Sequence, residues 1–200
     1  MGIDLVKGQR ISLEKESGGG LTKVVMGLGW DPVTSSGGGF FKKLASLLSK
    51  PKEIDLDASC ALFDSNKTPV DFVWFAQLRS KDGSIVHTGD NLTGAGDAGD
   101  DEQIIVDLSK IPSNVTTLVF TVNSFQGQTF NEVNNAFCRI VDSSNNKEIA
   151  RYTLSGGGTH TAMIMAKIYR HEGEWKMTAL GEAARGQVVA ELLPAIATVL

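Results

Sequence analysis

The sequence predicts an all-β protein, a β-sandwich of short antiparallel strands. Short segments rich in β-branched and aromatic residues recur along the chain and are separated by Gly, Asn, Asp and Ser. Helical periodicity is confined to two segments. The length of 200 residues suits one domain, since all-β units commonly reach about 200–250 residues. We therefore expect residues 1–200 to form a single sandwich domain.

The expected strands follow this pattern of apolar runs and turn signals. In chain order they are Arg10–Glu14, Lys23–Trp30, Leu56–Phe63, Phe72–Arg79, Gln103–Leu108, Val115–Val122, Ala136–Asp142, Glu148–Leu154, Thr161–Tyr169 and Trp175–Leu180. Turns are expected at residues 17–20, 145–146, 155–158 and 172–173. Cys60 and Cys138 both lie in apolar strand-like runs, which predicts buried thiols and no disulfide framework.

A short amphipathic helix is predicted within an insertion at residues 36–51. Its apolar face comprises Phe40, Leu44, Leu47 and Leu48, and Pro51 ends it. Three lysines add basic charge to the same segment, so it can contact a membrane surface, pack on a partner, or pack on its own sandwich. Deleting residues 36–50 would separate these interpretations.

A second helix is predicted at the C-terminal end, over residues 184–200. Apolar residues recur there at helical spacing, and Pro194 is expected to kink the helix. The apolar stripe consists of Val188, Val189, Leu192, Leu193, Ile196 and Val199. We expect this stripe to dock on an edge of the sheet.

The segment at residues 87–102 concentrates acidic side chains in a glycine-rich loop. Asp90, Asp97, Asp100, Asp101 and Glu102 lie there among four glycines. Carboxylates this close repel one another unless a cation neutralises them. Hard oxygen donors on a pliable loop suit Ca²⁺, which takes about 6–8 oxygen ligands. A solvated acidic loop is the alternative interpretation.

An antiparallel chain path would bring further acidic residues to this loop. If consecutive strands alternate in direction, Asp55 and Asp57 lie at the same end as the 90–102 loop. The segment from Asn123 to Asn134 also emerges there. This clustering strengthens the prediction of a calcium site.

Composition and charge argue against several classes of function. The net charge is −4 and no basic stripe interleaved with aromatic residues occurs, which excludes nucleic acid as an expected partner. No secretory signal or apolar run long enough to cross a bilayer is apparent, so we expect a cytoplasmic protein, with possible attachment to the inner face of the membrane. Histidines and cysteines lack zinc-ligand spacing, and no nucleophile elbow occurs.

Five segments form a distinctive set of motifs along the chain. They are Val24-Val-Met-Gly-Leu-Gly-Trp-Asp31, Ile54-Asp-Leu-Asp-Ala-Ser59, Gly89-Asp-Asn-Leu-Thr-Gly94, Gly99-Asp-Asp-Glu102 and Gln128-Thr-Phe-Asn-Glu-Val-Asn-Asn-Ala-Phe137. Together these segments resemble the TerD-domain family of tellurite-resistance and general stress proteins. The resemblance covers nearly the whole chain, and the insertion at 36–51 is most similar to the TerZ-type branch. It implies a β-sandwich that binds Ca²⁺ through its acidic loops. The implied ligands are Asp57, Asp90, Asn91, Asp97, Asp100, Asp101 and Glu102.

We therefore expect a non-enzymatic, calcium-binding stress-response module that acts as a scaffold for protein partners. One alternative is a calcium-dependent membrane or partner adaptor that uses the Phe40–Lys50 helix, which liposome pelleting would test. Another is a metal-dependent hydrolase or phosphotransferase, which activity screening with Mg²⁺ and Mn²⁺ would test. If the acidic residues serve only the metal, exchanging Asp100 and Asp101 for Asn should not destabilise the calcium-free protein.

Overall fold

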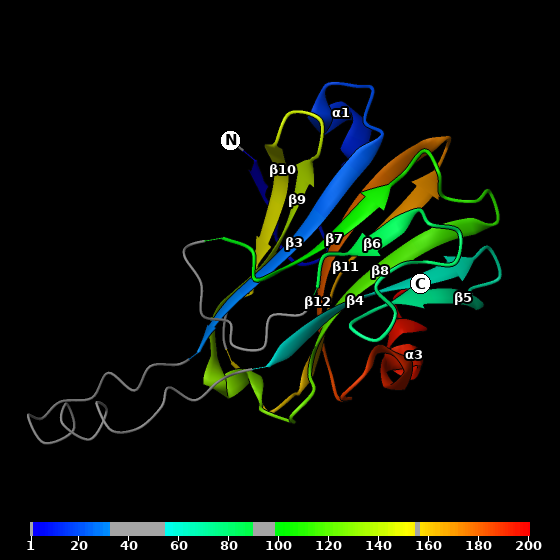
Figure 1. Ribbon diagram of the computed structural model, residues 1–200. Coiled ribbons are helices and arrows are strands. Elements are labelled where there is room, and N and C mark those ends of the chain that lie inside the picture. The colour runs from blue at the N-terminus through cyan, green and yellow to red at the C-terminus, as the bar shows by residue number, and fades with distance from the viewer. Residues whose placement is uncertain (1, 33–54, 90–98, 155–156) are drawn as a thin grey trace, which may run out of the picture.

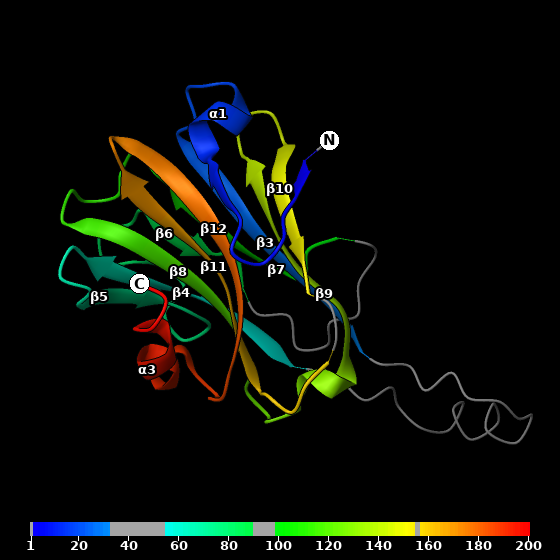
Figure 2. The ribbon, with the colours of Figure 1, turned by 180° about the vertical axis from the view of Figure 1, so that it is seen from behind.

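Two six-stranded sheets stack face to face to form a sandwich (Figures 1 and 2). The structure is a computed structural model that describes residues 2–32, 55–89, 99–154 and 157–200. The predicted insertion helix, including Phe40–Lys50, lies outside the described residues. The predicted all-β fold class is confirmed.

The first sheet has the strand order β1-β10-β9-β3-β7-β6, and the second has the order β2-β12-β11-β8-β4-β5. In the first sheet the strands are β1 (Ile3–Asp4), β10 (Lys147–Thr153), β9 (Val133–Asp142), β3 (Lys23–Pro32), β7 (Glu102–Asp107) and β6 (Ile85–His87). In the second they are β2 (Arg10–Ser12), β12 (Glu174–Ala184), β11 (Ala162–His171), β8 (Val115–Ser124), β4 (Leu56–Asp64) and β5 (Pro69–Val73). Neighbouring strands are antiparallel except β1 and β10, which are parallel.

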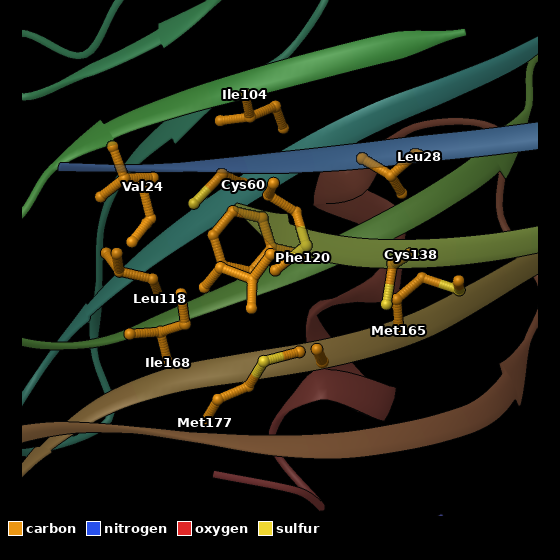
Figure 3. Packing of buried hydrophobic residues seen from close by; sticks show 14 of the residues in the cluster. Val24, Leu28, Cys60, Ile104, Leu118, Phe120, Cys138, Met165, Ile168 and Met177 are labelled. Carbon is orange, nitrogen blue, oxygen red and sulfur yellow. The ribbon is translucent and has the colours of Figure 1, made fainter. Parts of the chain in front are cut away.

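The main core lies between the two sheets, where alternate residues of the inner strands face one another (Figure 3). Phe120 of β8 is fully buried, and Val24, Leu28 and Ile104 of the first sheet face the same core from the opposite side. Cys60 and Cys138 are buried free thiols in this core, as their strand placement predicts. Burial raises the pKa of Cys138 to about 12 and raises the pKa of Cys60 still further above its ordinary value.

The C-terminal helical segment packs on the outer face of the second sheet and not on its edge. A 3₁₀ turn (Val189–Leu192) leads directly into α3 (Leu193–Ile196). This α-helix is shorter than the predicted helix over 184–200, since β12 continues to Ala184, residues 185–188 are not helical, and the turn that follows them is 3₁₀. Val189, Leu192 and Ile196 are buried against side chains from β4, β8, β11 and β12. Pro194 does not kink a helix. It occupies the first turn of α3, where its missing N–H costs no hydrogen bond.

Three short elements escape the sequence prediction. The segment expected to be a strand at Arg10–Glu14 turns into helix α1 (Leu13–Ser17), which Ser12 caps by accepting a hydrogen bond from the backbone N–H of Lys15. Strands β1 and β6 contain only two and three residues, too few for periodicity to be recognised. The expected strand at Phe72–Arg79 ends at Val73, where the chain turns back on itself.

Chain direction brings several strand ends together at one end of the sandwich. Strand β4 begins beside the end of β8, with Asp57 opposite Asn123. Strand β7 begins beside β3, with Glu102 opposite Leu28. In Figure 1 these ends and the start of β9 gather towards the lower left of the view. We call this region the acidic end, defined by Asp31, Asp55, Asp57, Asp101, Glu102 and Asn123.

Candidate functional site

The acidic end carries several polar side chains that are largely withdrawn from solvent. Glu102 and Asn123 are 1% exposed, Asp57 is 4% exposed and Asp55 is 6% exposed. The amide of Gln126 donates a hydrogen bond to Asp55 (3.2 Å), which ties the segment after β8 to the start of β4. The expected convergence of Asp55, Asp57 and the segment after Asn123 is thus present in the fold.

Glu102 connects the two sheets at this end. It is the first residue of β7, and its carboxylate accepts a hydrogen bond of 2.7 Å from the backbone N–H of Ala58 in β4. The same Oε2 atom lies 3.2 Å from Nε2 of His87, whose side chain is fully buried. Nδ1 of His87 accepts a hydrogen bond from the backbone N–H of Gly89 (3.1 Å), so in the neutral ring the proton resides on Nε2, facing Glu102.

The charged form of Asp101 is disfavoured by its burial and by its acidic neighbours. It accepts a hydrogen bond from the backbone N–H of Trp30 (2.8 Å), which favours its charged form. Burial nevertheless raises the pKa of Asp101 above its ordinary value, and repulsion from Asp31, Glu102 and Asp100 raises it further. Ionising Asp101 therefore costs free energy in this fold, and a cation beside it would recover that cost.

Asp100 has a cationic partner within the chain. Its two carboxylate oxygens accept hydrogen bonds from Nε (2.6 Å) and Nη2 (3.1 Å) of Arg139, and Gln103 donates a third hydrogen bond (3.0 Å). The Asp100 side chain is 1% exposed. Arg139 also pairs with Glu148 (3.2 Å), and its hydrogen bonds to Asp100 raise its own pKa. Asp100 therefore stabilises the outer face of the first sheet, a role that the expected ligand set did not include.

Two glycines of β3 leave room for the segment that carries Asp100. Gly27 lies between Gln103 of β7 and Arg139 of β9, the two residues that bond to the Asp100 carboxylate. A Cβ atom at Gly27 would lie 2.2 Å from that carboxylate. A Cβ atom at Gly29 would lie 2.4 Å from the ring of Phe137. The Gly-Leu-Gly sequence of β3 thus opens a groove on the outer face, in which residues 99–101 lie.

The structure describes only part of the expected calcium ligand set. Asp57, Asp101 and Glu102 lie at the acidic end, and Asp100 is bonded to Arg139, whereas Asp90, Asn91 and Asp97 lie outside the described residues. Within the described ranges, no group of three or more His, Cys, Asp or Glu side chains is placed to hold a metal ion. A calcium ion at this end would therefore need oxygen ligands besides the described Asp and Glu side chains.

The sequence interpretation missed Arg139 and His87 as residues that shape this end. The i, i+2 glycines in β3 were a usable signal, since glycines on one face of a strand indicate close approach by another segment. No comparable signal marked Arg139, because its partner Asp100 is 39 residues away in sequence.

We expect Asp101→Asn to stabilise the calcium-free protein slightly at neutral pH. A raised pKa in the folded state means that the ionised carboxylate destabilises the fold above that pKa. The amide oxygen of Asn can still accept the hydrogen bond from Trp30. The advantage of the variant should shrink as the pH falls through the pKa of Asp101, because the parent then becomes neutral too. Urea unfolding in chelator at pH 7 and pH 4 measures this; a loss of stability at pH 7 would contradict it.

Comparisons with known proteins place this geometry in a family. The family model described as the TerD domain matches residues 1–194. The chain belongs to the TerD-domain family. It is 50% identical over 190 residues to the tellurium resistance protein TerZ of Serratia marcescens, covering 95% of this chain and 94% of that protein. It is also 48% identical over 189 residues to the stress response protein SCP2 of Bacillus subtilis, covering 91% and 92% of the two chains.

Solved structures support the same fold. A homologue of the telluride resistance protein TerD from Streptomyces coelicolor superposes with a TM-score of 0.62 at 20% identity, covering 87% of this chain and 96% of that chain. A second structure, of a protein of unknown function, gives a TM-score of 0.65 at 24% identity. Among the described residues of our TerD-domain protein, no helix is long and apolar enough to span a membrane.

Proposed function

We propose that this TerD-domain protein is a non-enzymatic calcium-binding module of a stress response, including resistance to tellurium compounds. The stress and tellurium roles rest on the similarity to TerZ and SCP2. The calcium role rests on one observation in this fold. The ionised form of Asp101 is disfavoured by burial and by the carboxylates of Asp31, Glu102 and Asp100. A divalent cation is the simplest partner that relieves such repulsion.

The donor chemistry at the acidic end suits calcium better than a softer metal. The residues there offer carboxylate and amide oxygens, which are the ligands that Ca²⁺ prefers. In this proposal Asp90, Asn91 and Asp97 supply ligands, and Asp57, Asp101 and Glu102 contribute singly or in pairs, because the described residues contain no group of three such side chains placed for a metal ion. Asp100 contributes indirectly, because its bond to Arg139 anchors the segment that delivers Asp101 and Glu102. A bound calcium ion would supply positive charge to neutralise these carboxylates.

The same arrangement suggests how binding would reach a partner. Glu102 touches both sheets, through its own strand β7 and through Ala58 of β4. Its position fixes the start of β7 and therefore the end of the acidic loop. Calcium bound at that loop would neutralise its charge and create a surface for a protein partner in a stress-response complex. The two cysteines are buried with raised pKa values, which disfavours thiol chemistry as the route to tellurium resistance.

Calorimetry on chelator-treated protein tests the calcium proposal. We expect a Kd of about 10 µM or lower for Ca²⁺, within the range of calcium sensors, and much weaker binding of Mg²⁺. At a hundredfold excess over Kd, calcium should add about 2.7 kcal/mol to the free energy of unfolding. Asp57→Asn should weaken binding at least about tenfold, a loss of roughly 1.4 kcal/mol. Asp4→Asn removes the same charge from an exposed residue of β1 and serves as the matched control. Absence of binding heat, or equal affinity for the two ions, would refute the proposal.

A further inference from the structure

The end of the sandwich opposite the acidic end contains a pocket that the proposed calcium role does not use. Strand β11 begins beside Asn123 and runs away from the acidic end to His171, where a tight turn leads into β12. Figure 2 shows this turn at the top of the view, on the same side as α1. The pocket lies between α1, β2 and the ends of β11 and β12, and its volume is about 430 Å³.

The lining of this pocket is mainly basic, although the protein is acidic overall. The polar residues among those described are Arg10, Ser12, Lys15, Tyr169, His171 and Lys176, with one carboxylate from Glu16. The register places Ser12 of β2 beside Lys176 of β12, and Lys176 beside Tyr169 of β11. Three neighbouring strands therefore present this face in one row.

The cations of the pocket are poorly neutralised by the chain. Arg10 and Lys15 form no ion pair within the described residues, unlike Arg139 or Arg151, which pair with buried or half-buried carboxylates. Lys176 lies 3.8 Å from Glu172, whose side chain is 79% exposed, so this pair is weak in water. His171 lies 3.6 Å from the same carboxylate. The nearby Glu174 accepts a hydrogen bond from the hydroxyl of Ser12 (3.0 Å).

A further lysine adds to the positive potential on this face. Nζ of Lys167 lies 5.5 Å from the ring centroid of Tyr169, and Tyr169 lines the pocket. Burial lowers the pKa of Lys167, and the neighbouring charges of Arg10 and Lys67 lower it further. The cations are therefore close enough to repel one another, and an anion among them would remove that repulsion.

We propose that this basic pocket binds a small phosphate-bearing molecule of nucleotide size. The volume falls within the range of small-molecule sites, about 300–1,000 Å³. Arg10, Lys15 and Lys176 supply positive charge for phosphate oxygens. The hydroxyl of Ser12 already donates its hydrogen bond to Glu174 and is therefore not among the donors to phosphate. The ring of Tyr169 and the small exposed part of Ile11 supply apolar surface for the rest of the molecule.

Calorimetry with ATP, on chelator-treated full-length protein without divalent ions, tests this proposal. We expect measurable binding that weakens with added salt, and binding of pyrophosphate but not of adenosine. The double variant Lys15→Gln, Lys176→Gln should bind at least about tenfold more weakly, since each lost charged hydrogen bond is worth about 1.5 kcal/mol or more. The double variant Lys81→Gln, Lys110→Gln carries the same charge change on exposed lysines that pair with Asp71 and Asp107, and should bind like the parent.

Several outcomes would overturn the pocket assignment. An equal loss of ATP affinity in the two double variants would mean that ATP binding depends only on the net charge of the protein. Binding of adenosine as tight as ATP would mean that phosphate is not the recognised group. No ATP binding at about 5 mM, where a Kd of 1 mM would be detected, would exclude the site. Binding to vesicles containing phosphatidic acid, without binding to ATP, would replace the small molecule by a membrane surface. The calcium affinity of the Lys15→Gln, Lys176→Gln variant should equal that of the parent. A loss of ATP binding with unchanged calcium binding then assigns the effect to the pocket and not to the acidic end.

Discussion

Replacing Arg139 by Met should lower the free energy of unfolding by about 3 kcal/mol, because it leaves a buried charge without its partner. The Asp100 side chain is 1% exposed and receives two hydrogen bonds from the Arg139 guanidinium. Methionine can fill much of the space of the arginine stem, but it cannot neutralise or bond to the carboxylate. Urea unfolding in chelator measures the loss without interference from calcium.

The origin of this loss can be separated from lost packing. Adding Asp100→Asn to Arg139→Met should recover about half of the lost free energy, since the neutral amide no longer needs a counterion. Arg185→Met is a matched control, because Arg185 is bonded only to the hydroxyl of exposed Thr159 among the described residues. A loss below about 1 kcal/mol in Arg139→Met, the value expected of a surface pair, would mean that the Asp100 charge is well solvated.

Replacing Gly27 by Ala should cost about 3 kcal/mol or more, a large effect for one methyl group. The added Cβ would lie 2.2 Å from the Asp100 carboxylate, so either the carboxylate or the strand has to move. Moving the carboxylate also breaks its bonds to Arg139 and Gln103. The backbone at Gly27 does not adopt a left-handed conformation, so steric conflict alone accounts for the expected loss. Equilibrium unfolding again gives the number.

The cause of the Gly27→Ala loss can be tested in a protein that lacks the Asp100 carboxylate. In Asp100→Ala protein the obstructing carboxylate is absent, so Gly27→Ala should then be neutral or slightly stabilising, as expected when alanine replaces glycine in a strand. If Gly27→Ala lowers the free energy of unfolding equally with and without the Asp100 carboxylate, the loss does not come from a clash with Asp100. In the calcium titration, Gly27→Ala should also weaken binding, because it displaces the segment that delivers Asp101 and Glu102.

Local sequence patterns predicted most of the fold because alternation and turn residues act locally. Strands such as Val115–Ser124 carry enough apolar residues for their period to be evident. The short strand Ile85–His87 and the short helix Leu13–Ser17 escaped because three and five residues are too few to define a period. The C-terminal stripe correctly predicted burial at Val189 and Ile196, but not the surface that buries them. That surface is the outer face of the second sheet, an apolar patch assembled from four strands.

The acidic residues of the candidate site could be predicted from the sequence, but the ion pair between Asp100 and Arg139 could not. Short connections make consecutive strands alternate in direction. This alternation was enough to predict that Asp57, Asp101 and Glu102 lie at the same end of the sandwich. The sequence offered no means of distinguishing Asp100 from its neighbour Asp101, since both are aspartates in one loop. Their difference arises from strand register, which places Arg139 opposite Gly27 and therefore under Asp100. The expectation that exchanging both residues leaves the calcium-free protein unharmed now applies to Asp101 alone.

The lengths of the strands have a consequence for association between molecules. In both sheets the outermost described strands are short: β1 has two residues, β2 and β6 have three each, and β5 has five. Inner strands such as β3 and β12 have ten and eleven residues. Short edge strands expose few unpaired backbone groups, so another chain gains little by adding a strand there. Such a protein can accumulate to high concentration with little tendency towards edge-to-edge polymerisation, and any assembly it forms is expected to use side chains.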